Sequence, residues 1–167
     1  MPQTHALTAY GTINPLDALE DLVAARSWPF ERLSDEEMSL TLTGPWGTYR
    51  LSFFWERDDS AVQVACRSPL LAPTEQCLPV DEILGRINPR LWLGHFEKDP
   101  ESGEIIYRHT VLLADDSHAP GELLEHVVKI ALTETERFYP AFDFVLQHNH
   151  SPEEALAAAM IDTCGEA

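Results

Sequence analysis

The amino-acid sequence predicts an α+β fold, in which an antiparallel sheet of about five strands packs against helices. Two patterns in the chain carry this prediction. Stretches with apolar residues at helical spacing are interspersed with stretches in which apolar and polar residues alternate, as in a half-buried strand. The strand-like stretches follow one another through short turns, which suit antiparallel pairing. With 167 residues, 44% of them hydrophobic, the chain can bury one core.

The N-terminal part divides into a tail and a helix. Residues 1–13 show no periodicity and are expected to form a flexible tail, whereas residues 14–163 are expected to form one domain. Asn14 followed by Pro15 is typical of a helix start, because asparagine accepts a bond from a free N–H group and proline loses none there. Leucine and valine at helical spacing continue this helix to about Arg26.

A meander of three strands is expected next. The strands are residues 38–43, 49–55 and 62–67, with turns at 44–47 and 58–60. Residues 29–33 are expected to extend the first strand across a bend at 34–37. Alternation along these strands predicts one buried face.

A second helix and a hairpin follow. An apolar stripe from Val80 to Leu91 predicts a helix that Pro89 ends or kinks. Residues 92–97 and 104–113 read as two strands joined by a turn at 99–103. With the long helix described next, the order of elements is α-β-β-β-α-β-β-α, followed by a C-terminal helix.

Two helices complete the chain. Apolar residues from Leu124 to Val145 keep helical spacing, and Pro140 is expected to kink this helix or split it into two pieces. Ser151 and Pro152 begin a last helix, with acidic residues in its first turn where the helix dipole favours them.

Composition excludes several classes of partner. The chain has 28 Asp and Glu against 11 Lys and Arg, a formal net charge of −17, so nucleic acid and anionic membranes are poor partners. The three cysteines match neither a redox pair nor a zinc site. Neither a secretory signal nor a run of about 18 apolar residues is present, which predicts a cytoplasmic location. A solvated acidic surface and an acidic docking face are both compatible with the charge.

No reaction centre is recognisable. The sequence contains no GxGxxG, P-loop, GxSxG or HExxH motif, and the adjacent carboxylate pairs fall in predicted turns or at helix starts. We therefore assign no catalytic residue, no metal ligand and no cofactor, and expect a protein that is not an enzyme. If the last hairpin turns about Glu101, His95 lies opposite Tyr107 and His109 opposite Leu93, so that both imidazoles share one face. The alternative to a packing role is a small-molecule- or metal-dependent activity centred on His95, Tyr107 and His109.

Aromatic and arginine residues on the sheet suggest a protein-binding surface. Trp46 lies at a hairpin tip, and Phe54 lies on the face opposite the buried residues, beside Arg50 and Arg67. Such residues anchor protein contacts. A helix that covers Phe54 is the alternative. A homodimer is a further expectation, in which the second helix and its following strand bury Leu91 and Trp92 between two copies.

The chain resembles the bacterial YbjN family over most of residues 15–148. The residues that carry the resemblance are Gly44, Trp46, Tyr49, Leu51, Trp55, Ile87, Asn88, Leu93, Gly94, Phe96, Gly103, Arg108, His109, Pro140 and Ala141. The family is described as sensory transduction regulators, and the resemblance implies a fold like that of type III secretion chaperones, which are small, acidic, commonly dimeric and bind extended segments of partners. It supplies no catalytic residue. The helix from Ser151 departs from the basic plan and could cover a surface used elsewhere for binding.

The expected function is thus that of a non-enzymatic cytoplasmic module that binds a protein or peptide partner. The resemblance implies a sensory transduction regulator or a chaperone-like adaptor.

Overall fold

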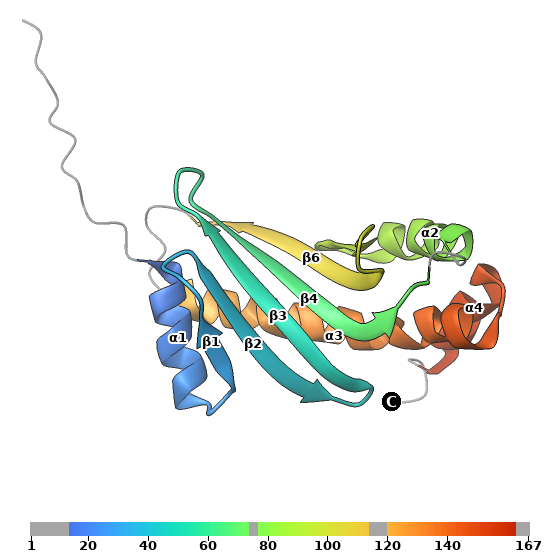
Figure 1. The fold of residues 1–167 in the computed structure, drawn as a ribbon, viewed down its shortest axis with the longest axis horizontal. Helices are drawn as coiled ribbons and strands as arrows, with labels where there is room; N and C mark the ends of the chain where they lie inside the picture. The colour runs from blue at the N-terminus through green and yellow to red at the C-terminus, as the bar shows by residue number, and fades with distance from the viewer. Residues whose placement is uncertain (1–13, 74–76, 114–119, 163–167) are drawn as a thin grey trace, which may run out of the picture.

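A six-stranded antiparallel sheet lies across one long helix (Figure 1). The computed structural model describes residues 14–73, 77–113 and 120–162. The elements in chain order are α1 (Pro15–Ala25), β1 (Phe30–Arg32), β2 (Glu37–Gly44), β3 (Gly47–Glu56), β4 (Ala61–Leu71), α2 (Cys77–Ile87), the 3₁₀ turn η2 (Asn88–Arg90), β5 (His95–Lys98), β6 (Glu104–Leu112), α3 (Pro120–His148) and α4 (Pro152–Asp162). The sheet order is β1-β2-β3-β4-β6-β5. The α+β class and the order of the expected elements are confirmed, while the expected tail 1–13 lies outside the described residues.

The sheet has one strand more than expected. Phe30–Arg32 does not extend β2 but turns back and pairs with it, with Phe30 opposite Leu40. The turn forms because the backbone N–H groups of Leu33 and Ser34 both donate to the carbonyl of Glu37, at 3.0 and 3.1 Å. A bend that was expected to keep the chain in one strand therefore reverses it.

The helices begin where their sequence signals predicted. The Asn14 side chain accepts a hydrogen bond from the backbone N–H of Leu16 at 2.9 Å, and Pro15 is the first residue of α1. At the other end of the chain, the Ser151 and Glu154 side chains each bond the other's backbone N–H, as in a capping box. Local capping therefore fixes both helix starts.

Pro140 was expected to kink the third helix or to split it into two pieces; α3 runs as one helix through Pro140, so the division into two pieces is wrong. A proline at this position removes one backbone hydrogen bond. Phe138, Ala141 and Phe142 are nevertheless buried on either side of it. Packing of one apolar face holds a helix more strongly than a single backbone bond.

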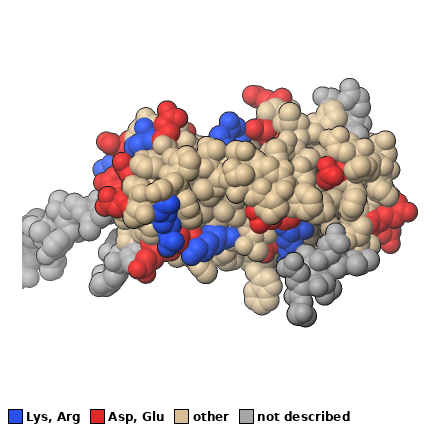
Figure 2. Space-filling view, turned by 90° about the horizontal axis from the view of Figure 1, so that it is seen from below, with Lys and Arg blue, Asp and Glu red and all other residues tan. Residues whose placement is uncertain are grey.

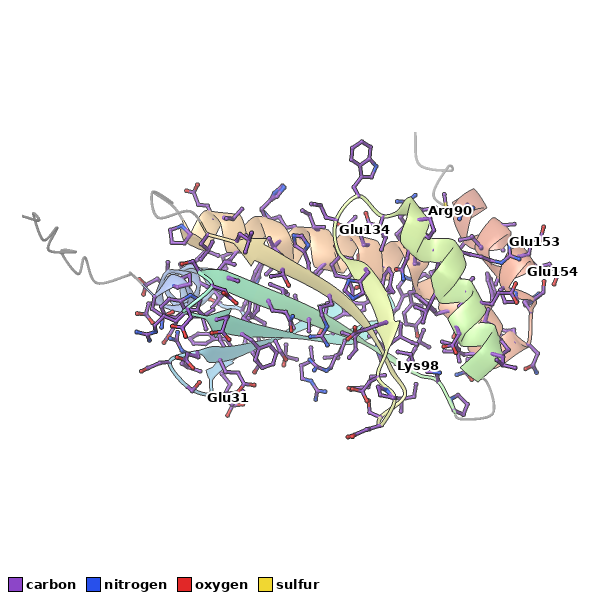
Figure 3. The ribbon with its side chains drawn as sticks, turned by 90° about the horizontal axis from the view of Figure 1, so that it is seen from above. Glu31, Arg90, Lys98, Glu134, Glu153 and Glu154 are labelled. Carbon is purple, nitrogen blue, oxygen red and sulfur yellow. The ribbon has the colours of Figure 1, made fainter. Side chains whose placement is uncertain are left out.

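The core lies between α3 and one face of the sheet, which we call the inner face. Its largest fully buried side chains include Tyr49, Phe53 and Tyr107 from the strands and Phe138 and Phe142 from α3. The helix α1 packs beside α3, while α2 and α4 pack together at the other end (Figure 1). In the view along the sheet, Lys98 of β5 lies near α2, where it pairs with Asp81 at 3.3 Å (Figure 3).

The opposite face, which we call the open face, is covered by no helix in the described part of the chain (Figure 1). Cross-strand pairing places two rows of side chains across it. One row is Thr41, Arg50, Arg67 and Ile106, and the next is Ser39, Ser52, Ala65 and Arg108. Figure 2 does not look onto this face but shows the molecule from below; there, Asp and Glu side chains gather mainly toward the two ends, while residues other than Lys, Arg, Asp and Glu cover most of the middle.

The two outermost strands of the sheet, β1 and β5, offer little free backbone. The β1 edge is three residues long. At the β5 edge, the Asn88 side chain donates to the Phe96 carbonyl at 3.0 Å and accepts from the Phe96 N–H at 2.7 Å. Asn88 thus occupies the position that a further strand would take, a device that keeps sheets from pairing edge to edge.

Candidate protein-binding surface

Three of the predicted binding residues lie together on the open face. Arg50 and Arg67 are direct cross-strand partners on β3 and β4, and Phe54 follows on β3 opposite Gln63. Phe54 is half-buried, and no helix of the described residues lies over it. The arrangement that the alternation predicted is therefore present, and of the two alternatives for Phe54 the structure shows the uncovered one.

Arg50 and Arg67 share one carboxylate. Arg50 Nη2 lies 3.1 Å from Glu104 Oε1, and Arg67 Nε lies 3.3 Å from Glu104 Oε2. Arg67 also donates from Nη1 to the Ser52 hydroxyl at 2.9 Å. Glu104 is the first residue of β6, and its backbone N–H donates to the hydroxyl of Ser102 in the preceding turn at 3.2 Å. This bond helps to fix the position of the Glu104 backbone.

A second cluster lies nearer the β5 edge. Arg108 donates to Glu97 Oε1 from Nε at 2.8 Å and from Nη2 at 2.5 Å, and to Gln63 Oε1 at 2.5 Å. His95 Nε2 lies 3.4 Å from the other oxygen of Glu97. Burial by itself raises the pKa of Glu97, but its contacts with Arg108 and His95 outweigh that effect and hold this pKa below its usual value.

A hollow of about 350 Å³ opens beside the first cluster. It is lined by Thr41, Thr48, Arg50, Arg67, Ser68, Pro69 and Glu104. Its wall is polar and carries two guanidinium groups against one carboxylate. A surface of this kind suits recognition of polar side chains rather than burial of an apolar ligand.

Trp46 does not join this surface. It lies in the turn between β2 and β3 and stacks on Tyr139 of α3, with ring centroids 5.2 Å apart and planes 6° from parallel. Because α3 lies on the inner side of the sheet, Trp46 is directed to the other side of the molecule from Arg50 and Phe54. Burial raises the pKa of Tyr139, which fits a ring held under a neighbour.

Leu91 and Trp92 lie in a loop, whereas Leu91 was predicted on the second helix and Trp92 in the strand that follows it. The predicted strand from residue 92 begins only at His95, because Gly94 adopts φ +67° and interrupts the extended chain. Leu91 packs partly against the core, whereas Trp92 is 98% exposed. The loop is held in place by the Tyr107 hydroxyl, which donates to the Leu93 carbonyl at 2.7 Å.

The predicted register of the last hairpin is wrong by one residue. His95 lies opposite Arg108 and not opposite Tyr107, which pairs with Phe96. The reason is the turn, in which the Asp99 carboxylate accepts from the N–H groups of Glu101 and Ser102 at 2.9 and 2.8 Å and centres the hairpin between them. A shift of one residue moves a side chain to the other face.

The two histidines therefore lie on opposite faces. His95 is on the open face, whereas His109 pairs with the core residue Val64 on the inner face, where burial lowers its pKa. Tyr107 is fully buried. The structure thus contradicts the shared site expected for His95, Tyr107 and His109. Among the described residues, no group of three or more His, Cys, Asp or Glu side chains is placed to hold a metal ion.

Sequence reasoning missed the partners of the arginines. Glu104, Glu97, Arg108 and Gln63 lie on the open face, but their placement depends on the pairing of β4 with β6, which are distant in the chain. Alternation within a strand gives the side of the sheet only once the register is known. The one available signal was the short β3–β4 turn, which pairs Gln63 with Phe54 and so indicates that both side chains lie on the same face.

The described helices contain no stretch that is long and apolar enough to span a membrane.

The chain matches a family model and is similar to a solved structure. Residues 15–144 match the model of the YbjN family, whose description is "Putative bacterial sensory transduction regulator". No curated protein matches the chain. Among solved structures, the chain is similar to a "Crystal Structure of the ExsC-ExsE Complex", with a TM-score of 0.46 and 14% sequence identity over 72% of this chain and 86% of that one.

Proposed function

The chain belongs to the YbjN family, and from this membership we propose that it is a cytoplasmic regulator or chaperone-like adaptor that binds a protein partner and catalyses no reaction. The bound segment lies on the open face of the sheet. One observation carries the proposal: every described helix that contacts the sheet does so at the inner face or the ends, which leaves uncovered a wide face that carries Arg50, Arg67 and the half-buried Phe54. Arginine and aromatic residues are enriched where proteins bind each other.

The chemistry of the open face favours an extended segment over a folded domain with an apolar patch. Of the large apolar side chains on this face, Phe54 is half-buried, Ile106 is almost fully buried and Leu112 is exposed at the end of β6. Ser52 and Ala65 form a floor of small residues beneath the arginine side chains. Guanidinium groups and hydroxyls at fixed positions can bond the side chains of a segment laid across them. The ion pairs on the face hold these groups in place before binding, which lowers the entropic cost of association.

Site-directed photo-crosslinking in cells tests where the partner binds. A photoreactive phenylalanine analogue replaces Thr41 or Thr110, both exposed on the open face, and in a matched control it replaces Thr133, exposed on α3. We expect both open-face positions to capture the same protein and the α3 position not to capture it. Equal capture at Thr133, or no adduct at either open-face position, contradicts the proposal.

A pair of double variants tests which side chains matter. Arg50→Ala with Phe54→Ala removes the charged and the aromatic anchor of the open face, and we expect it to abolish the crosslink from Thr110. Arg86→Ala with Leu123→Ala removes one arginine and one large apolar side chain from exposed positions on α2 and α3. This control is expected to leave the crosslink unchanged.

Self-association through the loop that carries Trp92 is a separate part of the proposal. A fully exposed tryptophan on a loop held by hydrogen bonds is typical of an interface anchor. We expect a dimer by light scattering after size exclusion, and a monomer for Trp92→Ala. Since Asn88 occupies the β5 edge, the copies meet through side chains and not through a continued sheet. A wild-type monomer at high protein concentration contradicts this part.

A further inference from the structure

We infer that the hollow between Arg50, Arg67 and Glu104 receives one carboxylate side chain, Asp or Glu, of the segment that binds the open face. The inference rests on the proposed function and names what the partner must carry. Two features lead to it: an unbalanced charge in this hollow, and donor groups of Arg50 left to solvent.

The charge of the cluster is not balanced. Arg50 and Arg67 stand directly opposite each other on β3 and β4, where two like charges destabilise a sheet. Glu104 contacts both, with one oxygen for each. Among the residues that line the hollow, two guanidinium groups face one carboxylate, which is an excess of one positive charge on a chain whose net charge is −17. Arg67 also interacts electrostatically with the Asp99 carboxylate, which lies outside this lining.

The neighbouring cluster shows what a balanced pair looks like on the same face. Arg108 has a carboxylate of its own, Glu97, which accepts two of its hydrogen bonds, and Gln63 accepts a third. By contrast, Arg50 donates among the described residues to Glu104 alone, through one nitrogen, and its side chain is 58% exposed. A guanidinium has five donors in a planar fork that fits a carboxylate. Arg50 therefore keeps donors for a second carboxylate.

The hollow also restricts the size and charge of what can enter. At about 350 Å³, with Thr41 and Thr48 hydroxyls on its wall, it accommodates a side chain and not a domain. One carboxylate cancels the single excess charge. A phosphate group, with a charge of about −1.5 to −2, would exceed it and meet Glu104 at short range. The repulsion from the acidic chain as a whole also disfavours a segment with many acidic residues. The geometry thus fits one carboxylate in an otherwise uncharged segment.

Nuclear magnetic resonance of the arginine Nε–Hε groups tests the inference with the full chain. The probes are two blocked pentapeptides, acetyl-Thr-Ser-Glu-Ser-Thr-amide and its Gln counterpart. We expect the Arg50 and Arg67 signals to shift with the Glu peptide and to stay in place with the Gln peptide. Shifts confined to other arginines, shifts of equal size with both peptides, or no shift at all overturn the inference.

Substitutions then separate an anion site from a merely structural ion pair. Glu104→Gln removes the competing carboxylate, so we expect the Glu peptide to bind about fivefold more tightly, whereas Arg50→Gln should weaken it about fivefold. Arg50→Lys keeps the charge but lacks the fork and should fall between wild type and Arg50→Gln. Arg86→Gln on α2 serves as the control and should change nothing. Unchanged or weaker binding by a folded Glu104→Gln protein overturns the inference.

Inorganic phosphate is the third probe. If it shifts the same signals at lower concentration than the Glu peptide, the hollow is a small-anion site and the inference fails. The proposed function fails separately, through the crosslinks from Thr41 and Thr110. Crosslinks on the open face with no peptide shift therefore reject the carboxylate subsite alone.

Discussion

Gly94 shows how much can depend on one missing side-chain atom. Its backbone adopts φ +67°, and a Cβ there would lie 2.5 Å from the Tyr107 hydroxyl and 2.7 Å from the Arg108 carbonyl. These neighbours belong to β6 and to a fully buried side chain, so they cannot move aside without cost. We expect Gly94→Ala to lower the free energy of unfolding by about 2–4 kcal/mol, measured by urea denaturation.

Gly85 provides the matched control for Gly94. It lies within α2, and a Cβ added to it meets no atom within 4 Å. Because glycine weakens a helix interior, Gly85→Ala should raise the free energy of unfolding by about 0.5–1 kcal/mol. Losses of similar size at both positions would contradict the role assigned to the Gly94 turn.

Glu136 is a second residue whose surroundings make a prediction. Its carboxylate packs against the backbone of Gly44, so a Cβ atom added to Gly44 would collide with Glu136 Oε1. Burial raises the pKa of this carboxyl group. Below the pKa of the unfolded chain both states are protonated and the group has no effect. Above it the unfolded state ionises first, so stability is lost as pH rises through the raised pKa and stays lost at pH 7.

We therefore expect Glu136→Gln to be more stable than the wild type at pH 7 and no more stable than the wild type at pH 3.5. Urea unfolding at the two pH values measures this difference. Glu101→Gln, in an exposed turn, is the control. A gain of equal size at both pH values would show that the effect does not come from ionisation.

At the scale of elements, the β5 edge depends on Asn88. Its side chain bonds both backbone groups of Phe96, and Asn88→Ala leaves them without these partners. We expect a loss of about 1–3 kcal/mol in the free energy of unfolding and, since the strand edge becomes free, concentration-dependent association seen by light scattering.

Asn88→Asp sharpens the test of the β5 edge. The carboxylate can still accept from the Phe96 N–H but has no donor for the Phe96 carbonyl. It should therefore lose stability as well, while its added charge keeps the protein from associating. If Asn88→Ala is as stable and as dispersed as the wild type, the edge is not protected by this residue.

The elements also show what the sequence could and could not predict. Local signals were sufficient for the start of α1, the β2–β3 and β3–β4 hairpins and the common face of Arg50, Phe54 and Arg67, because caps, short turns and alternation act over a few residues. The separate strand β1 was missed, since its reversal rests on two backbone bonds to Glu37 that leave no mark in composition.

The register of β5 with β6 was lost for a similar reason. The hairpin was expected to turn about Glu101, whereas its observed centre lies between Glu101 and Ser102, half a residue further along the chain. Only the hydrogen bonds of Asp99 decide between these two positions. That small difference placed His95 and His109 on opposite faces. The carboxylates of the open face were missed with it, because Glu97 and Glu104 belong to this same hairpin.

At the scale of the whole molecule, self-repulsion is the main electrostatic feature. The formal charge is −17, and most ion pairs join partly exposed groups, which contribute little each. Added salt screens both effects, but the repulsion between 28 acidic groups outweighs the isolated pairs. We expect the melting temperature to rise by several degrees between about 20 and 300 mM NaCl. A melting temperature that falls with salt would show that the ion pairs dominate.

The blocked edges of the sheet have a consequence for how the protein tells one partner from another. Because Asn88 bonds the backbone of β5 and β1 is short, these two strands offer a bound segment little backbone for continuing the sheet, a mode of binding that would accept almost any extended chain. It must be distinguished by its side chains. Alternate residues of each strand point to the core and to the open face, so the outward positions can change while the inward ones preserve the fold. Selectivity and folding can thus be varied independently along the same strand.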